Sequence, residues 1–224
     1  MTIDALENKY PDFKLTFEIA IIEHLGLNLY SEVHSAISEL IANSYDAEAS
    51  TLTIELPLGV PLGLEGQKII IKDDGHGMTY NECRDNFLRI GRNRRRNSRK
   101  SKNGKRKVIG KKGIGKLAGF GIANQLHVVT IADYKETEFL LDLKEIQSTK
   151  PAEVGDSDEP VEEIRIYRPK LIKVEEPSTT KQGTIVTLEK IRPLDEIDIN
   201  DFKARLSRKF AIFGDDFEET ITNS

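Results

Sequence analysis

The order of the predicted helices and strands limits this chain to few folds, because the two kinds of element do not alternate regularly. Apolar spacing predicts helices over residues 16–30, 32–47, 80–89, 115–125 and 198–213. Alternating or β-rich runs predict strands over 51–56, 68–73 and 126–133 and in TEFLLDL, VEEIRIY and GTIVTLEK. Regular βαβ alternation would indicate a parallel sheet, so this order favours an α+β two-layer sandwich.

Composition sets the broad class of protein. The 224 residues are 38% hydrophobic and 31% charged, which is typical of a soluble globular domain. The start of the chain is polar, and no apolar run is long enough to span a bilayer, so we expect a cytoplasmic protein without a membrane partner. Cys83 is the single cysteine, which excludes an internal disulfide and a cysteine-rich zinc site.

Charge is distributed unevenly along the chain. Residues 92–112, RNRRRNSRKSKNGKRKVIGKK, hold 12 of the 33 Lys and Arg residues and no Asp or Glu. The remainder carries 21 basic and 37 acidic residues. Such a block is either a mobile, solvated loop or a surface for nucleic acid, and the sequence leaves both interpretations open.

The helix predicted over 32–47 carries an unusual polar stripe. At about 100° per residue, Asn43 lies about 40° from Glu39, and Asp46 lies about 20° from it on the other side. Val33, Ile37, Leu40 and Ile41 occupy roughly the opposite face, and Ser31 is a candidate N-cap. The stripe is either a solvent-exposed face or one wall of a polar cavity.

Two glycine-rich segments follow this helix. IKDDGHGM, residues 71–78, ends a predicted strand with two carboxylates and a G-x-G turn, at which a ligand could approach the backbone. Gly110, Gly113 and Gly115 form a G-x-x-G-x-G cluster before a predicted helix, whose free N–H groups favour phosphate oxygens. Leu117 excludes a P-loop, which requires Ser or Thr at that position.

In this order, the segments resemble the motifs of the GHKL ATPase superfamily, named for gyrase, the ninety-kilodalton heat-shock chaperone, histidine kinases and MutL. ELIANSYDA resembles its N-box, DDGHGM its first glycine motif, GKKGIGKLAGFGIANQLHV its second, and GTIVTL its closing strand. The resemblance covers residues 31 to about 190. It implies a Bergerat fold, in which helices cover one face of a mixed, mostly antiparallel sheet.

The resemblance also implies roles for individual residues. Glu39 matches the general base that activates the attacking water, and Asn43 matches the residue whose side-chain oxygen binds Mg²⁺. Asp73 matches the aspartate that binds adenine, and Thr184 the threonine that supports it. The other matching positions contact the nucleotide or shape its pocket: Asp46, Ala47, Gly75, Gly77, Met78, Asn86, Gly113, Gly115 and Lys116.

A domain arrangement and a function follow from the resemblance. Residues 31–190 would form the ATP-binding domain, with a lid at about 91–115, between an N-terminal extension, 1–30, and a C-terminal helical element, 191–224. The domain would bind ATP and Mg²⁺, hydrolyse ATP slowly in the isolated chain, and act as a conformational switch in a larger assembly. Its expected partners are a second copy in an ATP-dependent dimer, nucleic acid at 92–112, and a further domain or protein that supplies a Lys or Arg.

Two other functions stay open at this point. NSYDA resembles the gyrase, MutL, chaperone and MORC branches more than the histidine kinases, but a kinase-type catalytic domain is one alternative. The second is a non-hydrolytic ATP sensor or a nucleic-acid-binding module, in which ATP only orders the lid.

Overall fold

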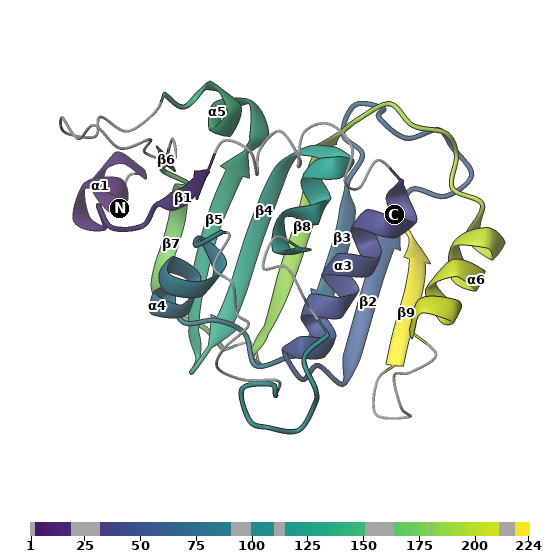
Figure 1. Ribbon diagram of the computed structural model, residues 1–224, viewed down its shortest axis with the longest axis horizontal. Coiled ribbons are helices and arrows are strands. Elements are labelled where there is room, and N and C mark those ends of the chain that lie inside the picture. The colour runs from purple at the N-terminus through teal and green to yellow at the C-terminus, as the bar shows by residue number, and fades with distance from the viewer. Residues whose placement is uncertain are drawn as a thin grey trace, which may run out of the picture.

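A computed structural model describes residues 3–18, 32–90, 100–109, 115–150, 164–179, 181–210 and 218–224. Within these ranges, a mixed sheet has the strand order β7-β5-β4-β8-β3-β2-β9 (Figure 1). Its strands are β2 (Thr51–Leu56), β3 (Ile69–Asp73), β4 (Ala123–Ala132), β5 (Lys135–Asp142), β7 (Lys170–Pro177), β8 (Gly183–Ile191) and β9 (Glu218–Asn223). Neighbouring strands are antiparallel except β2 and β9, which are parallel.

Helices cover one face of this sheet (Figure 1). They are α3 (Val33–Asp46), α4 (Tyr80–Glu82), the π-helix η1 (Cys83–Phe87) and the 3-10 helix η3 (Gly115–Gly121). The remaining elements lie near the margins of the sheet: α1 (Ile3–Lys9), β1 (Leu15–Glu18), β6 (Ile164–Tyr167), α5 (Leu143–Ser148) and α6 (Ile199–Phe210). The predicted α+β two-layer sandwich is therefore confirmed. No helix in the described ranges is long and apolar enough to cross a membrane.

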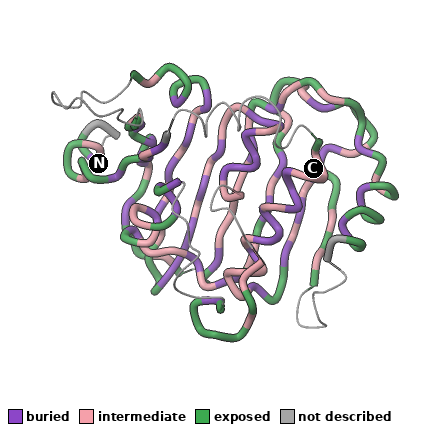
Figure 2. The backbone as a smooth tube through the Cα atoms, in the orientation of Figure 1, coloured by how far each residue is buried: buried purple, intermediate pink, exposed green. Residues whose placement is uncertain are grey.

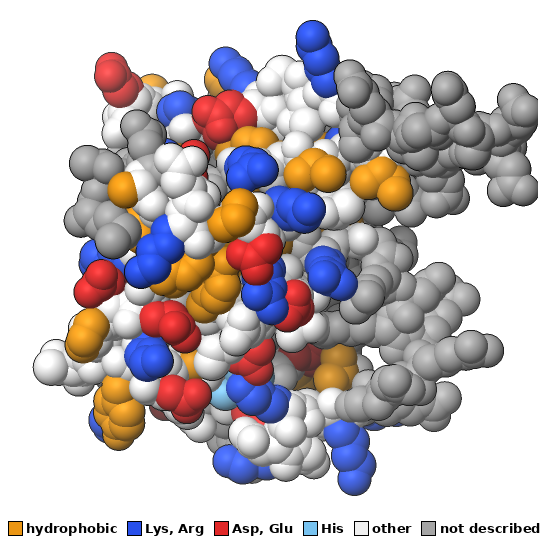
Figure 3. Space-filling model, turned by 90° about the vertical axis from the view of Figure 1, so that its left-hand side faces the viewer, with side chains coloured by type: hydrophobic (Ala, Val, Ile, Leu, Met, Phe, Trp, Pro, Cys, Tyr) orange, Lys and Arg blue, Asp and Glu red, His pale blue; other side chains and the backbone are white. Residues whose placement is uncertain are grey.

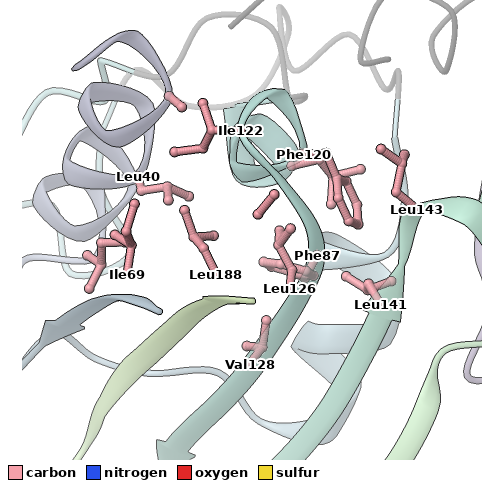
Figure 4. Close-up of a cluster of buried hydrophobic side chains, with 14 of the residues drawn as sticks. Leu40, Ile69, Phe87, Phe120, Ile122, Leu126, Val128, Leu141, Leu143 and Leu188 are labelled. Carbon is pink, nitrogen blue, oxygen red and sulfur yellow. The ribbon is translucent and has the colours of Figure 1, made fainter. Parts of the chain in front are cut away.

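The core lies between the helices and the sheet. Leu40 of α3 points toward Ile69 and Leu188 of the strands, and Phe120 of η3 lies among side chains of β4 and β5 (Figure 4). Figure 2 shows burial concentrated in the central strands and on the side of α3 that faces them. Burying this face turns the polar stripe of α3 away from the sheet.

Several predicted elements agree with the structure, and three predictions are wrong. The helix predicted over 115–125 ends at Gly121, because β4 begins at Ala123 and pairs with β8. Residues 15–18 are a strand rather than part of a helix over 16–30, because β1 pairs with β6, whereas residues 19–31 lie outside the described ranges. Phe13, Leu15 and Phe17 are buried at a period of two, which fits a strand. Helix α3 begins after Glu32, which occupies the N-cap position without a side-chain capping bond, so the Ser31 cap is wrong.

Helix α1 was not predicted from the polar start of the chain, and three later elements were not predicted either. Strand β7 pairs with β5, α5 follows β5 directly, and β9 follows α6 and pairs with β2. The helix predicted over 198–213 corresponds to α6, which ends at Phe210 in the structure. The chain thus returns to the sheet after α6.

Candidate nucleotide-binding site

The polar stripe of α3 is where the sequence places it. Glu39, Asn43 and Asp46 are half-buried, whereas Ala36, Ile37, Leu40 and Ile41 are buried against the core. These three side chains are therefore neither packed against the sheet nor fully exposed to solvent. The stripe thus forms one wall of a site, to which the glycine-rich segments contribute the other walls.

Glu39 meets the start of η3 directly. A Cβ atom added to Gly115 would lie 2.7 Å from Glu39 Oε2 and 3.7 Å from Glu39 Cβ. Only glycine lets the backbone approach the carboxylate this closely. The structure thus brings together the expected general base and the end of the G-x-x-G-x-G cluster, while Gly113 lies outside the described residues.

Asp73 ends β3 beside the other end of α3. Its Oδ2 accepts a 2.9 Å hydrogen bond from Ser44 Oγ, and its Oδ1 accepts from the N–H groups of Gly75, at 2.9 Å, and Thr184, at 3.2 Å. Burial raises the pKa of the Asp73 carboxyl, although these three donors act in the opposite direction. The expected adenine aspartate is therefore held in a fixed orientation by groups from three elements.

The G-x-G turn after Asp73 packs too closely for larger residues. A Cβ at Gly77, whose φ is +60°, would lie 2.0 Å from the carbonyl oxygen of Ile131. A Cβ at Gly75 would lie 2.8 Å from the carbonyl oxygen of Ala47, which also accepts a 2.9 Å hydrogen bond from the His76 N–H. The turn is thereby held against the end of α3.

Thr130 contacts two of the expected site residues, and the sequence analysis missed it. The Met78 N–H donates a 2.8 Å hydrogen bond to Thr130 Oγ1, which lies 3.1 Å from Thr184 Oγ1. Thr130 is completely buried in β4. It links the expected pocket residues Met78 and Thr184, and only the pairing of β4 with β8 brings it there, which no local sequence signal reveals.

The neighbouring carboxylate, Asp74, has a different environment. Its Oδ1 accepts hydrogen bonds of 2.7 and 2.8 Å from the N–H groups of Ser50 and Thr51, at the start of β2. Burial opposes the ionised form, but these bonds outweigh it and lower the pKa of Asp74. The two adjacent aspartates are thus distinguished by their partners: Asp74 fastens β2, and Asp73 lies at the candidate site.

Lys116 and Asn86 meet at the end of η1. Lys116 Nζ donates hydrogen bonds to the carbonyl oxygens of Asn86 and, at 2.8 Å, Arg89. A cation is favourable at the C-terminal end of a helix, where carbonyl groups lack helical partners. In this structure Lys116 therefore connects the start of η3 with the segment that leads into the basic stretch.

Part of that basic stretch is attached to the far end of α3. The hairpin, residues 100–109, donates several hydrogen bonds to Glu48, and the Ile109 N–H donates a 2.8 Å hydrogen bond to Asp46 Oδ1. Lys102 Nζ also lies 2.6 Å from Glu82 Oε1. These residues of the expected lid are thus docked, and residues 91–99 and 110–114 lie outside the described ranges.

A hollow lies between the N-terminal segment and η1. It has a volume of about 480 Å³ and is lined by Asp12, Lys14, Thr16, Arg84, Asp85, Arg89 and Ile90. Arg84 is already paired with Asp12, at 2.7 Å, and with Asp85, at 2.8 Å. These pairs fasten the N-terminal segment to η1.

Comparison with known protein families shows the family of this chain. The family model described as "Histidine kinase-, DNA gyrase B-, and HSP90-like ATPase" matches residues 30–183. The chain belongs to this GHKL-type ATPase family. The matched range includes α3, the G-x-G turn and η3, which are the segments that form the candidate site.

One relative of this GHKL-type domain is a protein of Herpetosiphon aurantiacus named "Putative type II restriction enzyme HgiDII". The two sequences are 30% identical over 214 residues, which cover 95% of this chain and 32% of the relative. The chain thus spans about a third of the relative's length.

Proposed function

We propose that this chain binds Mg²⁺–ATP and hydrolyses it, and that it acts as a conformational switch within a larger assembly. The arrangement of α3 carries the proposal. This one helix presents Glu39 to Gly115 and, through Ser44, holds the carboxylate of Asp73. An adenine-binding group and a group that acts on the phosphates are therefore linked by a single rigid element.

Adenine would bind at Asp73. A carboxylate that points into a partly desolvated site can accept a hydrogen bond from an exocyclic amine, and a keto group at the same position would meet a second acceptor instead. Gly75, Gly77 and Met78 would shape this end of the pocket together with Ala47. Thr184, whose N–H donates to Asp73, would hold the carboxylate in position.

The phosphates and the metal would lie along the rest of the stripe. Mg²⁺ prefers oxygen ligands and usually combines one or two protein oxygens with phosphate oxygens and water. The half-buried Asn43, between Glu39 and Asp46 on one face of α3, fits this donor set. When bound, the metal would neutralise charge that develops on the phosphates.

Glu39 would act as the general base for the attacking water. Gly113, Gly115 and Lys116 would contact the phosphates, and Asn86 would line the site. Lys116 Nζ donates two of its three N–H groups to the carbonyl groups of Asn86 and Arg89, so its contact with phosphate would use the third N–H or replace one of these bonds. Replacement would weaken the connection between η3 and η1, which is one way for ATP to act as a switch.

The name of the H. aurantiacus relative supports a DNA-acting assembly as the setting of this switch. A further domain or protein would supply the Lys or Arg that completes the site, and ATP would favour a dimer. The basic stretch, 92–112, would contact nucleic acid. Its hairpin exposes Lys105 and Lys107, whereas acidic and basic side chains are interspersed on the face near β7 and α1 (Figure 3). A cytoplasmic location fits these roles.

Incubation with γ-labelled ATP and Mg²⁺ tests the proposal. Release of free phosphate, lost in Glu39→Ala, is the expected result. A stable phosphoprotein would instead indicate a kinase-type domain. Tight binding of ATP without any turnover, even when the rest of the natural assembly is present, would indicate the non-hydrolytic sensor.

A further inference from the structure

The docked hairpin, residues 100–109, has its own internal structure. Lys100 and Lys107 form an antiparallel bridge, and the Ser101 N–H donates a 2.8 Å hydrogen bond to the Arg106 carbonyl group. The Gly104 N–H donates to the Ser101 carbonyl group at 2.9 Å. The hairpin is therefore a defined unit and can be positioned as a whole.

Glu48 is the main attachment point of this hairpin. Its Oε1 accepts hydrogen bonds from Ser101 Oγ and from the N–H groups of Asn103, at 2.9 Å, and Lys105, at 3.4 Å, and its Oε2 accepts from Asn103 Nδ2 at 2.9 Å. Burial alone would raise the pKa of Glu48, but the hydrogen bonds from Ser101, Asn103 and Lys105 lower it to about 2. The carboxylate is thus ionised and surrounded by donors from one hairpin.

The backbone at Glu48 is itself unusual. Its φ is +61°, a conformation that glycine adopts readily and that other residues rarely adopt. This backbone conformation is unfavourable for a glutamate, and the hydrogen bonds from the hairpin offset its cost.

The hairpin in turn contacts the C-terminal end of α3. The Arg106 guanidinium donates hydrogen bonds to the carbonyl groups of Tyr45, at 3.2 Å, and Ala49, at 2.7 Å, and stacks on the Tyr45 ring, 4.4 Å from its centroid. The Ile109 N–H then reaches Asp46 Oδ1. Glu48 and the end of α3 thus hold the same hairpin, just before the chain enters the glycine cluster.

Ile109 directly precedes Gly110, the first glycine of the G-x-x-G-x-G cluster. The cluster ends at Gly115, against Glu39. The residue before the cluster therefore contacts α3 at Asp46, and the last glycine of the cluster contacts α3 at Glu39. Glu39 and Asp46 are seven positions apart, or about 10 Å along the helix axis.

We propose that Glu48 is a positioning residue of the nucleotide site, which holds the hairpin on α3 so that the glycine cluster begins at a fixed point beside Asp46. Glu48 need not touch the nucleotide to do this. The inference rests on the proposed function, because it concerns the binding of Mg²⁺–ATP at the same site.

Glu48→Gly is the informative variant, because glycine suits the left-handed backbone and only the carboxylate is lost. We expect faster hydrogen exchange at the Asn103 and Ile109 amides and affinity for Mg²⁺–ATP reduced about fivefold or more, the lower end of ordinary coupling between sites. The melting temperature should fall only modestly, because the relieved backbone conformation offsets part of the lost hydrogen bonds. Glu48→Gln keeps one acceptor oxygen and should restore part of the affinity.

Glu175→Gly is a matched control. Glu175 also has a left-handed backbone, with φ of +50°, and lies in the edge strand β7. This variant should leave both the amide exchange and the ATP affinity unchanged.

Two results would overturn the proposal: unchanged exchange at Ile109 in Glu48→Gly, or faster exchange with unchanged ATP affinity. Failure of the wild-type protein to bind Mg²⁺–ATP would overturn the proposed function and this inference with it. The exchange data would still show whether Glu48 anchors the hairpin, so the two failures are distinguishable.

Discussion

Ser44 Oγ donates a 2.9 Å hydrogen bond to Asp73 Oδ2, and this bond joins α3 to the end of β3, where adenine is proposed to bind. Ser44 is buried on α3, five residues after Glu39 in the same helix. A shift of α3 would therefore move Glu39 and the support of Asp73 together. ATP bound at both ends would in turn restrain the helix, which is what a nucleotide-driven switch requires.

Asp73→Asn tests the adenine contact. The amide would turn a donor toward the N6 amine or lose its present partners, so affinity for ATP should fall by about 1–3 kcal/mol. GTP should bind poorly to the wild-type protein for a related reason, since its keto oxygen would face the carboxylate. Calorimetry that gave equal ATP affinities for the two proteins would remove Asp73 from this role.

Asp73→Asn should also change how the stability of the protein depends on pH. Because burial raises the pKa of Asp73 in the native state, the native protein binds this proton more tightly than the unfolded chain does. The contribution of Asp73 to stability is therefore largest below its unfolded pKa of 3.8 and is lost as pH rises through the raised value. In urea unfolding, the free energy of unfolding of Asp73→Asn minus that of the wild type should be larger at pH 7 than at pH 4. The opposite trend would mean that the carboxylate is better stabilised than its burial suggests.

Gly115→Ala tests the contact with Glu39. The backbone of Gly115 is not left-handed, and the added Cβ would displace a flexible carboxylate, so the protein should fold. A displacement of about 1 Å can reduce turnover about 10²-fold. ATP binding should change less than turnover in steady-state assays. In the double variant with Glu39→Ala, the alanine at 115 should cause little further loss, because both changes remove one function. Full additivity would show that Gly115 acts independently of Glu39.

The sequence predicted the parts of the site that depend on local spacing. The period of α3 placed Glu39, Asn43 and Asp46 on one face, and the glycine positions indicated where the backbone comes close to its neighbours. Each of these signals lies within a single segment and can therefore be recognised from the local sequence.

The missing parts depend on pairing between distant segments. Strand β1 pairs with β6, nearly 150 positions away, so its residues could equally begin a helix when only the local pattern is considered. Thr130 reaches Thr184 through strand register, and Glu48 reaches Asn103 through a docked hairpin. No local period reveals such contacts.

The basic stretch, 92–112, predicts salt-dependent binding of nucleic acid. Each neutralised phosphate of duplex DNA should contribute about −0.9 to the slope of log affinity against log salt. Arg94, Arg95 and Arg96 lie outside the described residues, but their replacement by Ser should flatten this slope. A matched control replaces three exposed lysines elsewhere in the chain: Lys170, Lys181 and Lys203. If no DNA or RNA binds at low salt, with or without ATP, the stretch is not a nucleic-acid surface.

Replacement of Glu39 should mainly reduce turnover, whereas replacement of Asn43 should mainly reduce the affinity for Mg²⁺–ATP. A general base acts on water in the transition state and contributes little to holding ATP in the ground state. Glu39→Ala should therefore keep ATP affinity within a few-fold while turnover falls by roughly two orders of magnitude or more. Asn43→Ala should weaken the binding of Mg²⁺–ATP itself, because Asn43 would bind the metal and, through it, the phosphates.

The measurement combines calorimetry with a sensitive phosphate assay, because turnover in the isolated chain is expected to be slow. Hydrolysis by Glu39→Ala at the wild-type rate, in protein free of contaminating ATPase, would show that this carboxylate has another role. The contact between Glu39 and Gly115 would then be a packing feature of α3 and η3.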